Sequence, residues 1–141
     1  MSEPIMATQI TISLTPAGIN MVGINIEQNL CFNNSYAVAE RNPGVEIIEG
    51  VILSIDIDNG GLPLAHVWNR LGNIHFDVTN ENIWQGREEM IESREIKYFM
   101  VKVHQCNEYE VGHVYEPSED TVANVDAMKE IIETNNNEES G

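Results

Sequence analysis

Basic residues are scarce in this chain. Only 7 of its 141 residues are lysine or arginine, against 23 aspartates and glutamates, and the formal net charge is −16. A surface of that sign repels phosphate backbones and anionic lipid headgroups, so nucleic acid and membranes are not expected partners. A basic protein surface is the kind of partner that such a charge favours.

Cysteines and long apolar runs are few as well. Cys31 and Cys106 lie far apart in the chain, which does not suggest a disulfide framework and fits a reducing, cytoplasmic location. No apolar run reaches the length of a membrane-spanning helix, and the first residues lack the basic start and long apolar stretch of a secretory signal. The length is that of one domain whose core needs no disulfide or metal.

The patterning of the chain predicts an α+β fold. Strands are expected over residues 9–15, 45–57 with an interruption at Gly50, 62–69, 74–79 and 96–104. One helix is expected from Phe32 to Arg41, ending at Asn42-Pro43-Gly44. A second begins at Ser118 and repeats Val122, Val125, Met128 and Ile132 at helical spacing.

These elements are expected to form a single domain over residues 1–134. We predict a mainly antiparallel sheet of four or five strands, with the first helix packed on one face and the second at the C-terminal end. Residues 135–141 are polar and acidic, and are expected to form a disordered tail.

Residues 62–79 predict a hairpin that brings a histidine to an aspartate. If the turn is centred on Leu71-Gly72, His66 lies directly opposite Asp77 across the two strands. Cross-strand side chains on one face are about 5 Å apart, so the carboxylate can accept a hydrogen bond from the imidazole and fix its tautomer. His75 lies on the same face and is a rival partner for Asp77.

Cys31 stands at the start of the first predicted helix. The unpaired backbone N–H groups and the positive end of the helix dipole favour a thiolate there. The same N–H groups, with the amide of Gln28 or Asn29, could hold the oxyanion of a tetrahedral intermediate. Trp68 is a candidate substrate-binding residue or lid beside His66, with burial in the core as the alternative.

Four short stretches carry a family resemblance. The motifs C-F-x-N-S at 31–35, V-E-I-I-E-G at 45–50, H-V-W-N at 66–69 and F-D-V-T at 76–79 resemble the transglutaminase-like core of the papain-like cysteine enzyme superfamily, and small bacterial and phage members in particular. The resemblance covers residues 28 to 80. It implies a cofactor-free acyl transfer or amide hydrolysis with Cys31 as nucleophile, His66 as base and Asp77 as orienting acid. The pair Asn33-Asn34 departs from the small helix formers that usually follow the cysteine.

Metal sites are not expected. The acidic turn at residues 56–60 resembles the start of a calcium loop, but Val67 stands at the twelfth position in place of glutamate. A zinc site at His104, Cys106 and His113 would lack a fourth ligand. The sequence therefore predicts a cysteine hydrolase or acyltransferase acting on a peptide, amide or ester. The alternative is a non-catalytic acidic binding or inhibitor protein with the same fold.

Overall fold

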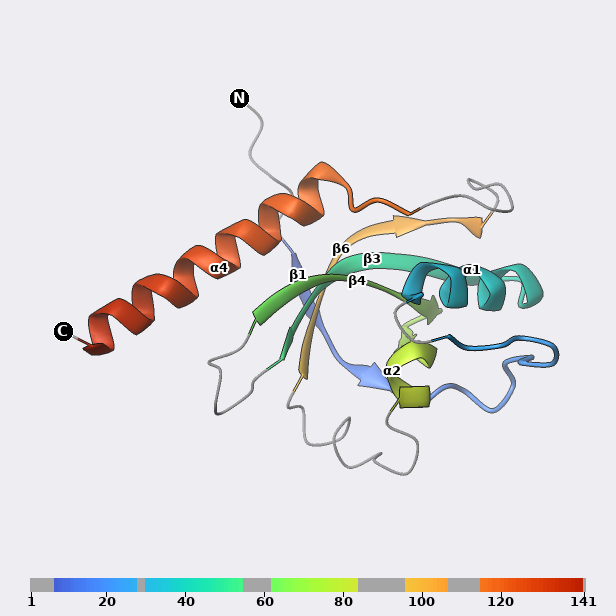
Figure 1. Cartoon of the computed structure of the whole chain (residues 1–141). Coiled ribbons are helices and arrows are strands. Elements are labelled where there is room, and N and C mark those ends of the chain that lie inside the picture. The colour runs from blue at the N-terminus through green and yellow to red at the C-terminus, as the bar shows by residue number, and fades with distance from the viewer. Residues whose placement is uncertain (1–6, 28–29, 55–61, 84–95, 107–114, 141) are drawn as a thin grey trace.

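The computed structural model describes residues 7–27, 30–54, 62–83, 96–106 and 115–140. The described part is an α+β fold, as predicted, with one six-stranded sheet and helices packed around it (Figure 1). Along the chain the elements are β1 (Thr8–Ile10), β2 (Ile12–Ser13), α1 (Cys31–Arg41), β3 (Val45–Ser54), β4 (Leu62–Leu71), β5 (Ile74–Phe76), α2 (Val78–Ile83), β6 (Ile96–His104) and α4 (Glu119–Ser140).

The sheet is mixed and has more strands than the sequence predicted. Its strand order is β1-β6-β3-β4-β5-β2, and β2 runs parallel to β5 while the other neighbours are antiparallel. The prediction of four or five antiparallel strands was wrong because residues 9–15 do not form one strand. The chain divides at Thr11, so β1 joins one edge of the sheet and β2 joins the other. This division curls the sheet towards closure.

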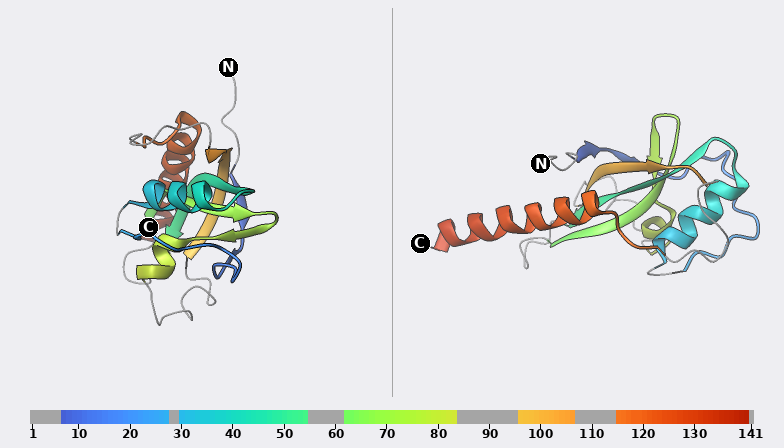
Figure 2. Two further views of the ribbon diagram at one scale, coloured as in Figure 1. Left: turned by 90° about the vertical axis from the view of Figure 1, so that its right-hand side faces the viewer. Right: turned by 90° about the horizontal axis from the view of Figure 1, so that it is seen from above.

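Side-chain alternation in the central strands separates two apolar clusters. On the outer face, Val38 and Phe32 of α1 pack against Ile47, Val67 and Phe76. The inner face, enclosed by the curl of the sheet, buries Ile48, Trp68 and Tyr98 against partly buried residues of strands at both edges. Both α1 and the first part of α4 lie against β3 and β4, as Figures 1 and 2 show.

Gly50 allows β3 to pass close to its neighbours. The register of β3 against β6 shifts between Glu49 and Gly50, which forms a β-bulge at the interruption that the sequence indicated. A Cβ atom on Gly50 would collide with the backbone oxygen of Phe99 and would lie 2.7 Å from Cη2 of Trp68. The missing side chain therefore leaves room for the Trp68 ring next to β3.

The hairpin between β4 and β5 forms with a different register. Gly72 adopts a positive φ of 61°, so the turn is centred on Gly72-Asn73 rather than Leu71-Gly72. Arg70 consequently pairs with His75, a displacement of two residues from the prediction. Because side chains alternate with a period of two, this displacement leaves each of them on its predicted face.

Helix α4 begins where the sequence predicted and ends later. The Ser118 hydroxyl accepts a hydrogen bond from the Thr121 N–H at 3.4 Å and caps the helix. The buried side of α4 centres on Thr121, whereas Val122, the first of the apolar residues at helical spacing, is exposed. The helix continues to Ser140 through most of the predicted disordered tail, since once nucleated it adds one hydrogen bond per residue. Its C-terminal part extends past the sheet (Figure 2).

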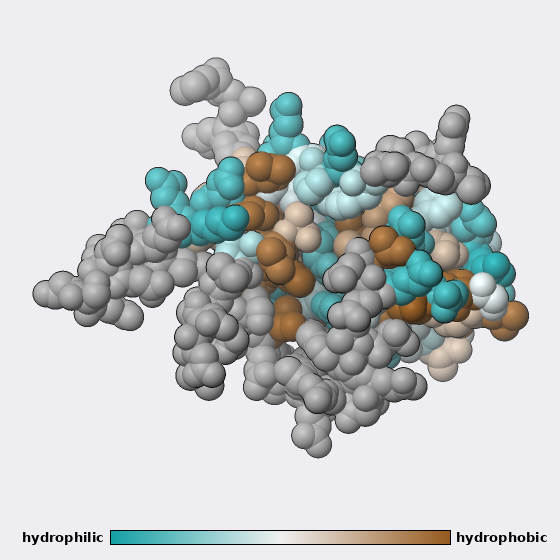
Figure 3. Space-filling model, viewed as in Figure 1, coloured by the Kyte–Doolittle hydropathy of each residue, from teal (hydrophilic) through white to brown (hydrophobic). Residues whose placement is uncertain are grey.

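Surface hydropathy is uneven around α4. Hydrophobic residues gather where this helix crosses the sheet (Figure 3). Large exposed side chains on these two elements are Leu64, Val122 and Ile131. Among the described helices, none is long and apolar enough to cross a membrane.

Candidate functional site

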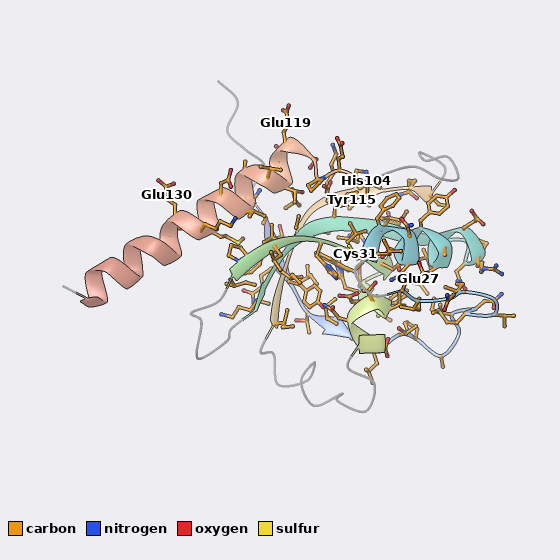
Figure 4. The ribbon with its side chains drawn as sticks, in the orientation of Figure 1. Glu27, Cys31, His104, Tyr115, Glu119 and Glu130 are labelled. Atoms are coloured by element: carbon orange, nitrogen blue, oxygen red, sulfur yellow. The ribbon has the colours of Figure 1, made fainter. Side chains whose placement is uncertain are left out.

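The three residues predicted as a triad meet where α1, β4 and α2 come together. Cys31 is the first residue of α1, at the end of the helix that lies over the sheet (Figure 4). His66 lies on β4, and its Nε2 is 2.7 Å from Oδ2 of Asp77. Cys31 is close enough to the His66 ring to act on its pKa, through a side-chain hydrogen bond and through its charge. The predicted contact between His66 and Asp77 is confirmed, although the hairpin register on which it was based is not.

Asp77 reaches His66 because it caps a helix. Strand β5 ends at Phe76, and α2 begins at Val78, so Asp77 is not the strand residue that was predicted. Its Oδ1 accepts a hydrogen bond from the Asn80 N–H at 3.3 Å, as an N-cap aspartate does. With Oδ1 occupied by the helix, Oδ2 is directed at the imidazole.

Oδ2 of Asp77 has a second donor, which the sequence did not indicate. The Tyr98 hydroxyl donates to it at 2.6 Å, from β6 on the inner face of the sheet. The Asn80 side-chain Nδ2 in turn donates to the Tyr98 oxygen at 2.9 Å. The contact depends on how β6 and α2 are arranged around the curled sheet, and no local pattern in the sequence reports that arrangement.

The electrostatics of the site favour a charged His66–Asp77 pair. Burial lowers the pKa of His66, but the Asp77 carboxylate more than offsets this and, with a smaller effect from Cys31, raises it from 6.5 to about 10. Burial also acts to raise the pKa of Asp77, yet His66, Tyr98 and the Asn80 N–H bring it below its usual value. At neutral pH the pair is therefore imidazolium and carboxylate.

Asn34 ties the start of α1 to its surroundings. Its Nδ2 donates to the Glu27 carbonyl at 2.8 Å and to Oγ1 of Thr79 at 2.9 Å, and its Oδ1 accepts from the Glu27 N–H at 3.0 Å. One buried amide thus fixes the segment before Cys31 and also α2. The Asn33-Asn34 pair, which departs from the family pattern, has this structural role at its second residue.

The first turn of α1 offers hydrogen-bond donors next to the thiol. The first hydrogen bond within the helix joins the Asn34 N–H to the Leu30 carbonyl at 2.9 Å. The backbone N–H of Cys31 precedes that bond, in the part of a helix where donors have no acceptor within the helix itself. Gln28 and Asn29, the other predicted oxyanion donors, lie outside the described residues.

Trp68 does not have the substrate-binding position predicted for it. Its side chain is fully buried, because β3 covers it at Gly50. Its ring stacks beside that of His66 with centroids 6.3 Å apart, and its Nε1 donates to Nδ1 of His75 at 3.0 Å. Trp68 therefore packs beside His66 from within the core.

His75 is not the partner of Asp77. Burial lowers the pKa of His75 to about 4, and the charge of Arg70 acts in the same direction. The neutral ring accepts the Trp68 hydrogen bond described above. The rival pairing considered for Asp77 is thus replaced by a contact within the core.

The described residues contain no group of three or more histidine, cysteine, aspartate or glutamate side chains placed to hold a metal ion. His104, considered as a zinc ligand, has its Nε2 3.1 Å from Oε1 of the buried Glu49. His113 and the acidic turn at residues 56–60 lie outside the described part.

Comparison with known proteins does not assign a family. No family model matches the chain, and neither a curated protein nor a solved structure matches it significantly. The resemblance to the transglutaminase-like core therefore stays a prediction from the four sequence motifs.

Proposed function

We propose that this protein is a thiol-dependent enzyme that transfers an acyl group from an amide or ester. The observation that carries the proposal is a buried, ionised His66–Asp77 pair in contact with a thiol at a helix N-terminus. Holding two charges in a core costs several kcal/mol per ion before their attraction is counted. A perturbed histidine beside a potential nucleophile is typical of catalytic sites.

In the proposed mechanism Cys31 forms the covalent intermediate. Because His66 is already an imidazolium, Cys31 reacts as the thiolate paired with it, and the sulfur attacks the substrate carbonyl. The N–H groups of the first turn of α1 stabilise the oxyanion of the tetrahedral intermediate. The imidazolium then donates its proton to the departing amine or alcohol, and the C–N or C–O bond breaks to leave a thioester on Cys31.

The second half of the cycle restores the Cys31 thiolate beside the imidazolium. A water molecule or a second amine gives a proton to His66 and attacks the thioester carbonyl, which releases the acyl group and the Cys31 sulfur. Asp77 remains ionised and keeps the Nε2–H of His66 fixed throughout, so the other ring nitrogen serves the thiol. These steps need no cofactor. The cell compartment proposed for the reaction is the cytoplasm, and the substrate class is a peptide, another amide or an ester.

A non-catalytic role is the second candidate. The net charge of −16 favours association with a basic protein, as a binding or inhibitor domain would require. Such binding would weaken as salt is added and would be unaffected by Cys31→Ala. The two candidates therefore differ in their dependence on a single sulfur atom.

Turnover of amide and ester substrates tests the proposal. We expect activity in the wild type and in Cys106→Ala, the matched cysteine control, and its loss in Cys31→Ala. His66→Ala should lose nearly as much, and the double variant Cys31→Ala/His66→Ala should lose little more, because the two residues act as one unit. Activity that persists in Cys31→Ala would exclude Cys31 as the nucleophile.

A further inference from the structure

Asp77 holds His66 with an oxygen that has two donors. Oδ2 lies 2.7 Å from Nε2 of His66 and 2.6 Å from the hydroxyl oxygen of Tyr98. We propose that Tyr98, itself held by Asn80, is a positioning residue that fixes the Asp77 carboxylate in line with the histidine. The consequence for catalysis rests on the proposed function, whereas the positional role rests on these contacts.

The chemistry of the groups sets the direction of every hydrogen bond in this chain. An ionised carboxylate only accepts, so both the His66 Nε2–H and the Tyr98 O–H donate to Asp77. Tyrosine has a single hydroxyl hydrogen, so its oxygen must accept from the Asn80 amide. Because burial and the neighbouring carboxylate raise the pKa of Tyr98, the phenol remains a donor across the physiological range.

The bonds of Asn80 fix both ends of this arrangement. Its backbone N–H holds Oδ1 of Asp77, and its side chain holds the hydroxyl that contacts Oδ2. Rotation of the carboxylate about its Cβ–Cγ bond would break bonds at both oxygens. The imidazole therefore meets an oxygen whose position is set by β6 and α2 together, in a buried polar network.

The aromatic ring of Tyr98 has a separate structural role. It packs edge-on against Trp68, with centroids 5.2 Å apart, and edge-on against His66 at 6.2 Å. Phenylalanine keeps these ring contacts and removes only the hydroxyl. Tyr98→Phe therefore separates positioning from packing.

The direction in which the His66 titration midpoint shifts in Tyr98→Phe distinguishes a positioning role from simple hydrogen bonding. Within the described part of the chain, the ionisable groups that face His66 are Cys31 from α1, Asp77 at the start of α2, and Tyr98 from β6. If the carboxylate stays in place without the hydroxyl, it has one donor fewer and attracts the imidazolium more strongly, so the titration midpoint of His66 rises. If the carboxylate is no longer held in line, the midpoint falls.

We expect the midpoint of His66 to fall by about one to two pH units in Tyr98→Phe, the equivalent of one hydrogen bond to a charged group. NMR of the imidazole nitrogens, titrated across the alkaline range, measures it. The matched control is Tyr115→Phe, which removes the hydroxyl that donates to the buried Glu49 at 2.9 Å, on the other face of the sheet. That variant should leave the midpoint of His66 unchanged.

An unchanged or raised midpoint in Tyr98→Phe, or an equal fall in both variants, would overturn the positioning role. Should Tyr98→Phe fail to fold, Asn80→Ala tests the same positioning role, because it removes the amide that holds the Tyr98 hydroxyl and keeps the backbone N–H cap. The midpoint of His66 must fall there too. The measurement requires no substrate. A protein without turnover can therefore still show the shift, and a working enzyme can lack it, so the two proposals fail separately.

Discussion

Replacing Asp77 with asparagine tests the electrostatic basis of the site with little disturbance of the fold. Asparagine is as good an N-cap as aspartate, so α2 should still begin at Val78. The negative charge next to His66 is lost. An amide nitrogen beside Nε2 also forces that ring atom to accept, which moves the ring hydrogen to the nitrogen available to Cys31.

The magnitude follows from the pKa of His66. Its rise from 6.5 to about 10 corresponds to a preference for the imidazolium on the order of 5 kcal/mol, most of it from Asp77. Without that carboxylate, burial keeps the pKa of His66 below its usual value, and the ring is neutral at pH 7. A thiol with no charged partner is only a few per cent thiolate at this pH, so alkylation of residue 31 should slow by about 10 to 30-fold.

Two assays check Asp77→Asn. NMR titration should show that the His66 midpoint falls from about 10 in the wild type to below 6.5 in the variant. Mass spectrometry should show that iodoacetamide modifies Cys31 faster than Cys106 in the wild type, and that it modifies the two cysteines at similar rates in the variant. Cys106 is the internal control, because burial and Glu40 raise the pKa of its thiol. Turnover should fall by roughly 10³ to 10⁴-fold, the loss expected when a triad loses its orienting carboxylate. An unchanged His66 midpoint would refute the reasoning.

The same pKa predicts a dependence of stability on pH. Because the pKa of His66 is raised in the folded protein, its ion pair contributes fully below about pH 6.5 and the contribution is lost as the pH rises through about 10. Two further predictions concern the scaffold. Glu49→Gln, which disturbs bonds from His104, Tyr115 and Ser118, should lower the free energy of unfolding in urea by roughly 2 to 4 kcal/mol, against less than about 1 kcal/mol for the half-buried Glu46→Gln. Burial acts to raise the pKa of Glu49, but these hydrogen bonds outweigh it and lower the pKa to about 2, so the contribution of Glu49 to stability is present above pH 4.5 and is lost as the pH falls towards 2. An equal loss of stability in the two variants would contradict the stabilising role of the Glu49 hydrogen bonds. Gly50→Ala should lower the free energy of unfolding by about 3 kcal/mol or prevent folding, because the new methyl group meets the backbone of β6. Gly18→Ala, with open space around it, should change the free energy of unfolding by no more than about 1 kcal/mol. A Gly50→Ala variant of normal stability would show that the bulge can relax.

The sequence predicted the members of the site better than the geometry that joins them. Cys31, His66 and Asp77 could be found because each lies in a short local pattern: the start of a helix, an alternating strand, and an aspartate near a turn. The displaced hairpin register did no harm, since an error of two residues preserves the face of every side chain. Asp77 reaches His66 as a helix cap, and the segment V-T-N-E that follows it is a readable sign of a helix start.

The parts that could not be predicted depend on distant segments meeting. The division of residues 9–15 between opposite edges of the sheet depends on curl and closure, to which a short alternating run gives no clue. Tyr98 and Asn34 looked like ordinary strand and helix residues, and only their partners in space give them a role. Trp68 was ambiguous for the opposite reason, because a tryptophan two residues after His66 suits a core or a lid equally well. The close approach of Gly50 to its ring places Trp68 in the core.

The central claim is that Cys31 carries the acyl group, and trapping that intermediate tests it most directly. With p-nitrophenyl acetate at pH 7, we expect a burst of about one nitrophenolate per protein, followed by slower release, as accumulation of an acyl-enzyme produces. Peptide mapping of quenched samples should place the acetyl group on Cys31 in the wild type and in Cys106→Ala, with neither burst nor adduct in Cys31→Ala. An acetyl group found on another residue, or a burst that survives in Cys31→Ala, would contradict the account.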